Sequence, residues 1–388
     1  MRTLSDLSFS AIVAGFIAVL VAFTSSAVIV FQAAQALGAT PAEIASWMLA
    51  LGIAMGTTSI ALSLWYRIPV LTAWSTPGAA LLVTSVAGVT MPQAIGAFMV
   101  CAVLVIAMGV TGWFERAMQR IPQALGAAML AGVLLRFGLG LFAALQTQFG
   151  LVLAMVIVYL IARRYWPRYA IPTVLLVGIL VVAGAGQLQL NTLRLELAQP
   201  VFTMPQFSLA ALASVALPLF IVTMASQNIP GVAVIRGAGY TPPISPLITW
   251  TGMAALLLAP FGAFTVNLAA ITAAITMGRD AHEDPAKRYI AATAAGIFYI
   301  LIGLFGATFT ALFAMFPAEM VAALAGLGLL GTIGNGLATA LRDETQRDAA
   351  LVTFLVTASG LTLFGIGAAF WGIVFGLSAT AILQWRKR

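Results

Sequence analysis

The chain has 388 residues, of which 62% are hydrophobic and 7% are charged, with a formal net charge of +7 and a mean hydropathy of +1.07. This composition excludes a soluble globular domain and predicts an all-α polytopic membrane protein. Its single cysteine, Cys101, excludes an internal disulfide, and its single histidine, His282, argues against a His/Cys metal site. No metal or other cofactor is expected.

Apolar runs separated by Pro, Gly and charged residues predict fourteen membrane spans. The second span starts with a capping box, Thr40-Pro41-Ala42-Glu43, and a kink is expected at Pro230 in the eighth. The polar segment 188–206, a surface helix or loop, divides the spans into two groups of seven. In chain order the spans are 8–36, 41–66, a broken third span after Pro69, 92–113, 123–145, 149–162, 172–187, 208–237, 246–258, a broken tenth span after Pro260 that ends near 278, 288–309, 317–340, 349–365 and 368–384.

The positions of the basic residues set the orientation. With fourteen spans and a cytoplasmic N-terminus, all Lys and Arg residues except Arg136 and Arg194 fall in cytoplasmic segments. The positive-inside rule therefore predicts that both termini are cytoplasmic, and it accounts for the basic balance without a nucleic-acid partner.

Seven spans in each half is an odd number, so the two halves are expected to face opposite ways as inverted repeats. A short sequence echo supports this. Ser25 precedes Gly38-Ala39-Thr40-Pro41 by the spacing that separates Ser226 from Gly239-Tyr240-Thr241-Pro242.

Two spans are poorly suited to continuous helices. Pro69 and Pro77 flank a β-favouring stretch, and Thr76-Pro77 predicts the N-cap and first residue of a half-helix. Asn267 follows Pro260 by seven residues, the spacing that separates Thr76 from Pro69, and is predicted to cap a second half-helix. Such paired breaks point to a transporter's binding site, although the same residues also fit simple kinks in spanning helices.

All acidic residues are predicted to lie near a membrane surface, so an intramembrane hydrolase or metalloenzyme is not expected. The interior instead offers neutral polar groups where spans 1, 3, 8 and 10 meet. Two helix N-termini that face one hollow, with no lysine or arginine, suit a small anion such as a carboxylate. The candidate substrate-binding residues, which also include aromatic ones, are Phe23, Ser25, Ser26, Trp74, Ser75, Thr76, Gln227, Asn228, Phe264, Thr265 and Asn267.

The chain resembles the bacterial benzoate/proton symporter family (BenE-like proteins) along essentially its whole length, and four stretches carry the resemblance most specifically. The resemblance implies a bacterial inner-membrane protein with the seven-plus-seven inverted fold of the uracil transporters. It also implies a core domain (1–120 and 208–310) that carries substrate and a gate domain (121–207 and 311–388) that can form a homodimer within the lipid. The stretches are 15–27, 72–78, 226–231 and 264–272.

Nucleobase transporters of that fold hold the base with two glutamates, where this chain has Gln227 (or Asn228) and Val266. Their absence fits an anionic substrate and removes the obvious proton carrier. A proton then travels on the carboxylic acid itself, or through Glu43 or water. We therefore expect a secondary active transporter of a small aromatic carboxylate, benzoate first, coupled to protons. The alternatives are an anion exchanger or channel of the same fold, and a non-transporting membrane scaffold.

Overall fold

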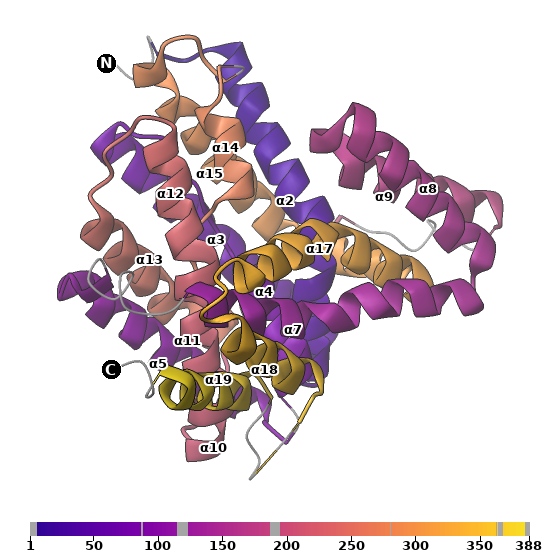
Figure 1. Cartoon of the computed structure of the whole chain (residues 1–388). Coiled ribbons are helices and arrows are strands. Elements are labelled where there is room, and N and C mark those ends of the chain that lie inside the picture. Colours follow the sequence, from indigo (N-terminus) through magenta and orange to yellow (C-terminus); the bar gives the residue numbers. More distant parts are fainter. Residues whose placement is uncertain are drawn as a thin grey trace.

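A computed structural model describes residues 6–86, 88–114, 123–186, 195–279, 281–361, 363 and 368–384. This part of the chain is mostly helical, and its single sheet has two very short strands. The strands are β1 (Thr72–Ala73) and β2 (Asn267–Leu268). The helices are α2 (Phe9–Ala36), α3 (Pro41–Tyr66), α4 (Thr76–Ser85), α5 (Met91–Val110), α7 (Gln123–Ala143), α8 (Phe149–Tyr165), α9 (Ala170–Gly184), α10 (Leu209–Ala211), α11 (Leu217–Thr223), α12 (Ile229–Gly237), α13 (Ile244–Leu258), α14 (Ile271–Met277), α15 (Tyr289–Leu304), α16 (Gly306–Ala314), α17 (Ala318–Leu341), α18 (Arg347–Ala358) and α19 (Ala368–Gln384) (Figure 1).

Within the described ranges, seven helices are long and apolar enough to cross a membrane, and α2, bent by 43° between Phe23 and Ser26, makes an eighth. The polytopic, mostly helical architecture expected from composition is therefore confirmed. Local signals placed several ends correctly. Ser8 caps α2, and Thr40 and Glu43 form the predicted capping box at the start of α3.

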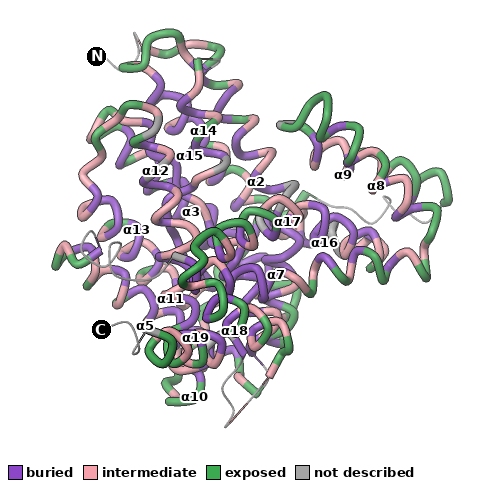
Figure 2. The backbone as a smooth tube through the Cα atoms, viewed as in Figure 1, coloured by how far each residue is buried: buried purple, intermediate pink, exposed green. Residues whose placement is uncertain are grey.

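The outward faces of the peripheral helices are apolar. Figure 2 shows exposed residues along α8, α9 and α19, and these include Leu160 and Leu180, each 60% exposed. Large exposed leucines are unfavourable in water and cost nothing in lipid. Trp65 and Trp166 are exposed beside basic residues at helix ends, as in the aromatic belt of a membrane interface. The exposed surface therefore fits a bilayer.

Helices α3 and α15 cross at glycines. A Cβ on Gly52 would lie 2.6 Å from the carbonyl oxygen of Tyr299, and a Cβ on Gly296 would lie 2.7 Å from that of Gly56. Small residues at such a crossing let two backbones touch, which is a main source of helix association in lipid. The two helices thus form the rigid centre of one helix group, which also includes α2, α5 and α13.

We expect Gly296→Leu to lower the melting temperature of the detergent-purified protein strongly, because a larger side chain must separate α3 from α15 at a cost of about 1–3 kcal/mol or more. Gly140→Leu on α7 is the matched control, since nothing lies within 4 Å of its added Cβ. Equal melting temperatures for the two variants would contradict close packing at the crossing. The measurement is thermal unfolding followed by size-exclusion chromatography.

Both predicted breaks are present, but the caps differ from the prediction. α4 begins at Thr76 with Ser75 as its N-cap, whose hydroxyl accepts from the Gly78 N–H, so the cap lies one residue before the predicted Thr76. Asn267 was wrongly predicted as a cap. Its backbone pairs with Ala73 in the sheet, and α14 starts only at Ile271, after a residue with no side-chain cap.

The two strands run antiparallel, with Thr72 opposite Leu268 and Ala73 opposite Asn267. Antiparallel pairing sends α4 away from one end of the ribbon and α14 away from the other. The starts of both half-helices therefore flank the same short ribbon. This arrangement brings together residues nearly two hundred positions apart in the chain.

Hydroxyl groups on one face of α3 satisfy the buried backbone of the first break. The Ser59 hydroxyl accepts from the Thr72 N–H at 3.0 Å and lies 2.9 Å from the Thr72 hydroxyl. One turn later, the Ser63 hydroxyl accepts from the Val70 N–H at 3.1 Å and donates to the Val70 carbonyl at 3.0 Å. In a bilayer no water replaces such partners, so these serines make the extended segment possible.

Ser59→Ala is expected to destabilise the protein by about 1–3 kcal/mol, because it leaves the Thr72 N–H buried without a partner. Thr57→Ala is the control, since the exposed Thr57 hydroxyl bonds only to carbonyls of its own helix. Unfolding in denaturant reports the difference. If both variants matched the wild type, β1 would not depend on α3.

The linker between the halves crosses one end of the molecule. Residues 195–206 have no regular structure, so the loop alternative holds for this part, while 187–194 lie outside the described residues. The linker's backbone N–H groups donate to residues at the ends of several elements: Ala198 to the Leu304 carbonyl, Val201 to the Ser46 hydroxyl, Thr203 to the Pro260 carbonyl and Gln206 to the Pro92 carbonyl. These bonds hold the linker against the ends of α3, α5 and α15.

Near the opposite ends of these helices, Asp6 joins three elements. Its carboxylate accepts from the Tyr289 hydroxyl at 2.8 Å and pairs with Arg67 at 3.3 Å and Lys287 at 3.9 Å. The Tyr289 hydroxyl and the two cations hold the pKa of Asp6 below its ordinary value, against a smaller opposing effect of desolvation. The start of α2, the end of α3 and the start of α15 are thereby tied together.

Candidate functional site

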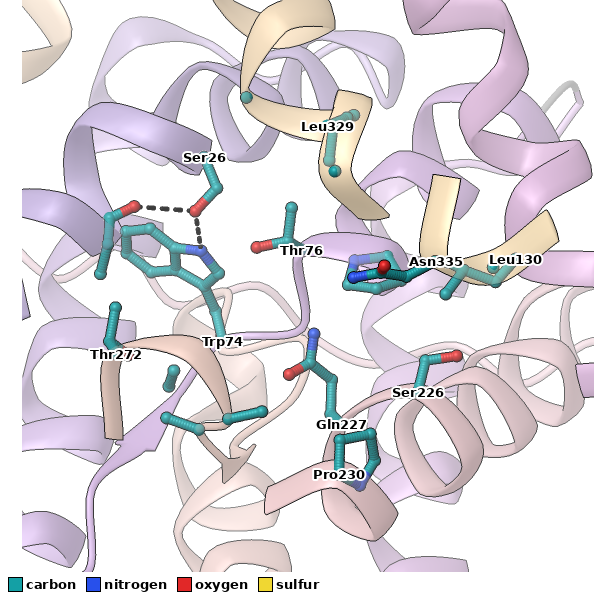
Figure 3. Close-up of a pocket in the computed structure, with 18 of the residues that line it drawn as sticks. Ser26, Trp74, Thr76, Leu130, Ser226, Gln227, Pro230, Thr272, Leu329 and Asn335 are labelled. Atoms are coloured by element: carbon teal, nitrogen blue, oxygen red, sulfur yellow. Dashed lines mark hydrogen bonds between the residues drawn. The ribbon is translucent and has the colours of Figure 1, made fainter. Parts of the chain in front are cut away.

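A cavity of about 970 Å³ lies between two groups of helices. One wall comes from α2, the β1–α4 junction, residues 224–230 and α14, and the other comes from α7, α8, α9 and α17. Figure 3 shows Ser26, Trp74, Thr76 and Gln227 around the open space on the first side, and Asn335 of α17 on the second. Its size is that of a small-molecule site.

Trp74 forms part of the wall just before α4. Trp74 is buried, with only 3% of its surface exposed, and its indole Nε1–H donates to the Ser26 hydroxyl at 2.9 Å (Figure 3). The Ser26 hydroxyl donates in turn to the Ala22 carbonyl at 2.9 Å. Behind the indole, Phe23 packs edge-on at 4.9 Å between ring centroids. The orientation of the indole is therefore fixed from two sides.

The first turn of α4 also faces the cavity. Ser75 is fully buried, and its hydroxyl satisfies the Gly78 N–H while its own N–H donates to Thr265 at 3.3 Å. Pro77 has no N–H. The Thr76 hydroxyl and N–H form no hydrogen bond within the described part of the chain, and Thr76 lines the cavity. The positive end of a helix is thus presented to the cavity with donors free.

Opposite Thr76, the wall is built by an irregular turn. Residues Met224–Asn228 form a π-helical turn directly before α12, next to Pro230, where the sequence predicted a kink. Such turns are frequent at functional sites. Ser226 and Gln227 line the cavity, and the amide of Gln227 points into it (Figure 3). Asn228 points away and accepts from the Leu268 N–H at 3.0 Å, which ties the turn to β2.

Four of the residues predicted from the sequence line the cavity: Ser26, Trp74, Thr76 and Gln227. Phe264 packs instead between Trp47 and Phe98. Asn267 is fully buried, and neither polar atom of its amide has a partner among the described residues. The side chain of Ser25 lies outside the described residues. The predicted residues that stand behind the wall are Phe23, Ser75, Asn228, Phe264, Thr265 and Asn267.

The second wall was missed by sequence reasoning. Tyr159 and Arg163 of α8 and Asn335 of α17 all line the cavity. The expectation of a site without lysine or arginine is therefore wrong at its edge, because the sequence placed Arg163 only in a cytoplasmic segment. The spacing of Tyr159 and Arg163 was a weak sequence signal of this wall, since the two residues are four positions apart and share a helix face.

The chemistry of the cavity is that of a binding site. Apart from Arg163, its lining is neutral, with apolar side chains, hydroxyls and amides. Within the described ranges no three His, Cys, Asp or Glu residues gather as a metal site would require. A carboxylate meets donors here and no negative charge, while Trp74 and the apolar lining suit an aromatic ring.

Comparisons with known proteins identify the family and the fold. Residues 5–382 match the family model described as benzoate membrane transport protein. The chain is 53% identical to inner membrane protein YdcO of Escherichia coli (strain K12), over 94% of this chain and 93% of that protein. It is 42% identical to the benzoate membrane transport protein of Acinetobacter baylyi, over 99% and 98% of the two chains. The solved transmembrane domain of the cyanobacterial bicarbonate transporter BicA has the same fold, with a TM-score of 0.56 at 12% identity and coverage of 97% and 96%.

Proposed function

Because the chain belongs to the benzoate membrane transport protein family, we propose that it carries benzoate or a closely related aromatic carboxylate across the bacterial inner membrane by proton-coupled secondary transport. Membership of a transporter family means that the chain is an integral membrane protein and not an enzyme. The observation that carries the proposed substrate class is the cavity, in which free helix-start donors and an amide face an aromatic wall.

In the proposed complex the carboxylate lies between Thr76 and Gln227. It accepts from the Thr76 hydroxyl and N–H at the start of α4 and from the Gln227 amide, and the helix end adds a partial positive charge. The ring packs against Trp74 and the apolar lining. Ser75, Thr265 and Asn228 hold these donors in place through the hydrogen bonds described above.

The proposed mechanism moves one helix group against the other. In this proposal, α2–α5 and α10–α15 form the expected core domain, and α7–α9 with α17–α19 form most of the expected gate, in a fourteen-span inverted repeat. α16 lies across the expected boundary at residue 310. With the positive-inside orientation and both termini cytoplasmic, the α8–α9 turn faces the cytoplasm. Since the lining reaches Arg163 and Pro167 of that turn, this conformation is inward-facing. A homodimer through the gate leaves the core free to move.

Proton coupling needs no carboxylate in the wall. No Asp or Glu is among the described residues that line the cavity, and Glu43 is engaged at the start of α3, where its carboxylate accepts from the Thr40 N–H at 2.7 Å. We therefore propose that the proton crosses with the substrate, as the neutral acid or through water in the cavity.

The test uses purified protein. Calorimetry is expected to detect benzoate binding, and proteoliposomes with an inward proton gradient are expected to accumulate benzoate. Uptake that ignores the gradient but needs an anion on the opposite side of the membrane would identify an exchanger, the alternative function. Absence of benzoate binding would reject the proposed substrate.

A further inference from the structure

We propose that Arg163 forms a second carboxylate-binding site at the mouth of the cavity, where an incoming anion is held before it reaches Trp74 and Thr76. Arg163 lies in the last turn of α8 and carries the one charge among the described residues that line the cavity. The inference rests on the proposed function and names a step within it, the encounter between the carboxylate and the second wall.

The guanidinium of Arg163 reaches across to α17. Its Nη2 atom lies 3.6 Å from the position that a Cβ would take on Gly331. Because Gly331 has no side chain, space remains beside the guanidinium. Asn335, four residues further along α17, shares this helix face, is exposed and points into the cavity (Figure 3). A cation and an amide donor from two helices therefore border one opening.

Both side chains are available to a ligand. Among the described residues, the side chains of Arg163 and Asn335 form no hydrogen bond and no ion pair. The positive charge of Arg163 attracts a carboxylate, and its N–H groups can donate hydrogen bonds to it. A single charge at the opening of a cavity with apolar walls also attracts anions from solution, and this attraction weakens as salt is added.

The neighbouring residue supplies a matched control. Arg164 carries the same charge one position later, but it does not line the cavity, and its guanidinium lies over the Tyr165 ring at 5.6 Å from the centroid. Arg164→Gln removes the same net charge from the same helix end. Any effect specific to Arg163 therefore reflects its place at the opening.

The experiment measures the association rate of benzoate with the detergent-purified full chain by stopped-flow tryptophan fluorescence, in about 10 mM and about 300 mM sodium chloride, a salt without a carboxylate. At low salt, Arg163→Gln and Arg163→Met are expected to slow association about 10-fold, within the range known for electrostatic steering. Arg163→Lys and Arg164→Gln are expected to keep the wild-type rate. At high salt the differences should shrink to about 2-fold, because screening removes the attraction.

Two results would overturn this site alone: wild-type association rates in both neutral variants, or an equal loss in Arg164→Gln. A 10-fold loss in Arg163→Lys would also overturn it, since the charge is kept. Melting temperatures show that each variant is folded, and two neutral variants guard against one folding poorly. If the wild type does not bind benzoate in calorimetry, the proposed function fails and this inference fails with it.

Discussion

Replacing Gln227 with glutamate is expected to weaken benzoate binding about 100-fold near neutral pH. Glutamate has nearly the shape of glutamine but adds a negative charge to a wall that faces the carboxylate. Two unit charges about 5 Å apart repel by about 3 kcal/mol at an effective dielectric constant of about 20, which corresponds to that loss of affinity. Calorimetry on the purified protein measures the change.

Gln227→Met separates the charge effect from the loss of the amide. It keeps the length of the side chain, and its expected loss is about 10-fold, because only one hydrogen bond to a charged group disappears. Equal affinity in Gln227→Glu and the wild type would place the carboxylate elsewhere in the cavity. The result would leave the transporter family untouched, because that conclusion rests on the match over residues 5–382.

The second large effect is expected at Trp74. Trp74→Ala should weaken benzoate binding about 30-fold, since truncating a buried aromatic residue in the wall of a binding site costs about 2 kcal/mol. Trp74→Phe should stay within about 5-fold of the wild type. It keeps a ring against Phe23 and loses only the donor to Ser26, whose own bond to Ala22 remains.

Trp65→Ala is the matched control for Trp74→Ala, because Trp65 is 82% exposed at the end of α3 and does not line the cavity. Its benzoate affinity should equal that of the wild type. Melting temperatures are needed for both variants, since truncating a buried tryptophan also costs about 3–5 kcal/mol of stability. A stable Trp74→Ala protein with wild-type affinity would show that the ring of the substrate lies elsewhere.

Local chemistry explains which parts of the site could be predicted. Pro69, Pro77 and Pro260 made continuous helices improbable, and the breaks are where these residues stand. The positions of the caps could not be predicted with the same accuracy. Ser75 and Thr76 are both good N-caps, and Asn267 had a competing partner, the backbone of Ala73, that no local pattern revealed.

The support of the breaks and the second wall depended on contacts between distant segments. Ser59 and Ser63 on α3 resemble ordinary polar residues of a membrane helix until β1 is placed beside them. Arg163 resembles an interface anchor until α17, with Gly331 and Asn335, is placed next to it. Side chains so far apart in sequence leave no periodicity that links them.

From the sequence alone it follows that this protein belongs in a membrane. The sequence also shows at which residues its helices are interrupted, and that neutral polar groups gather where the breaks lie. Composition, prolines and charge placement act locally or on average, so they need no fold. Only the tertiary structure decided which polar groups remain free for a ligand, because that depends on which neighbours already satisfy them: Asn228 is used by β2, while Thr76 and Gln227 face the cavity.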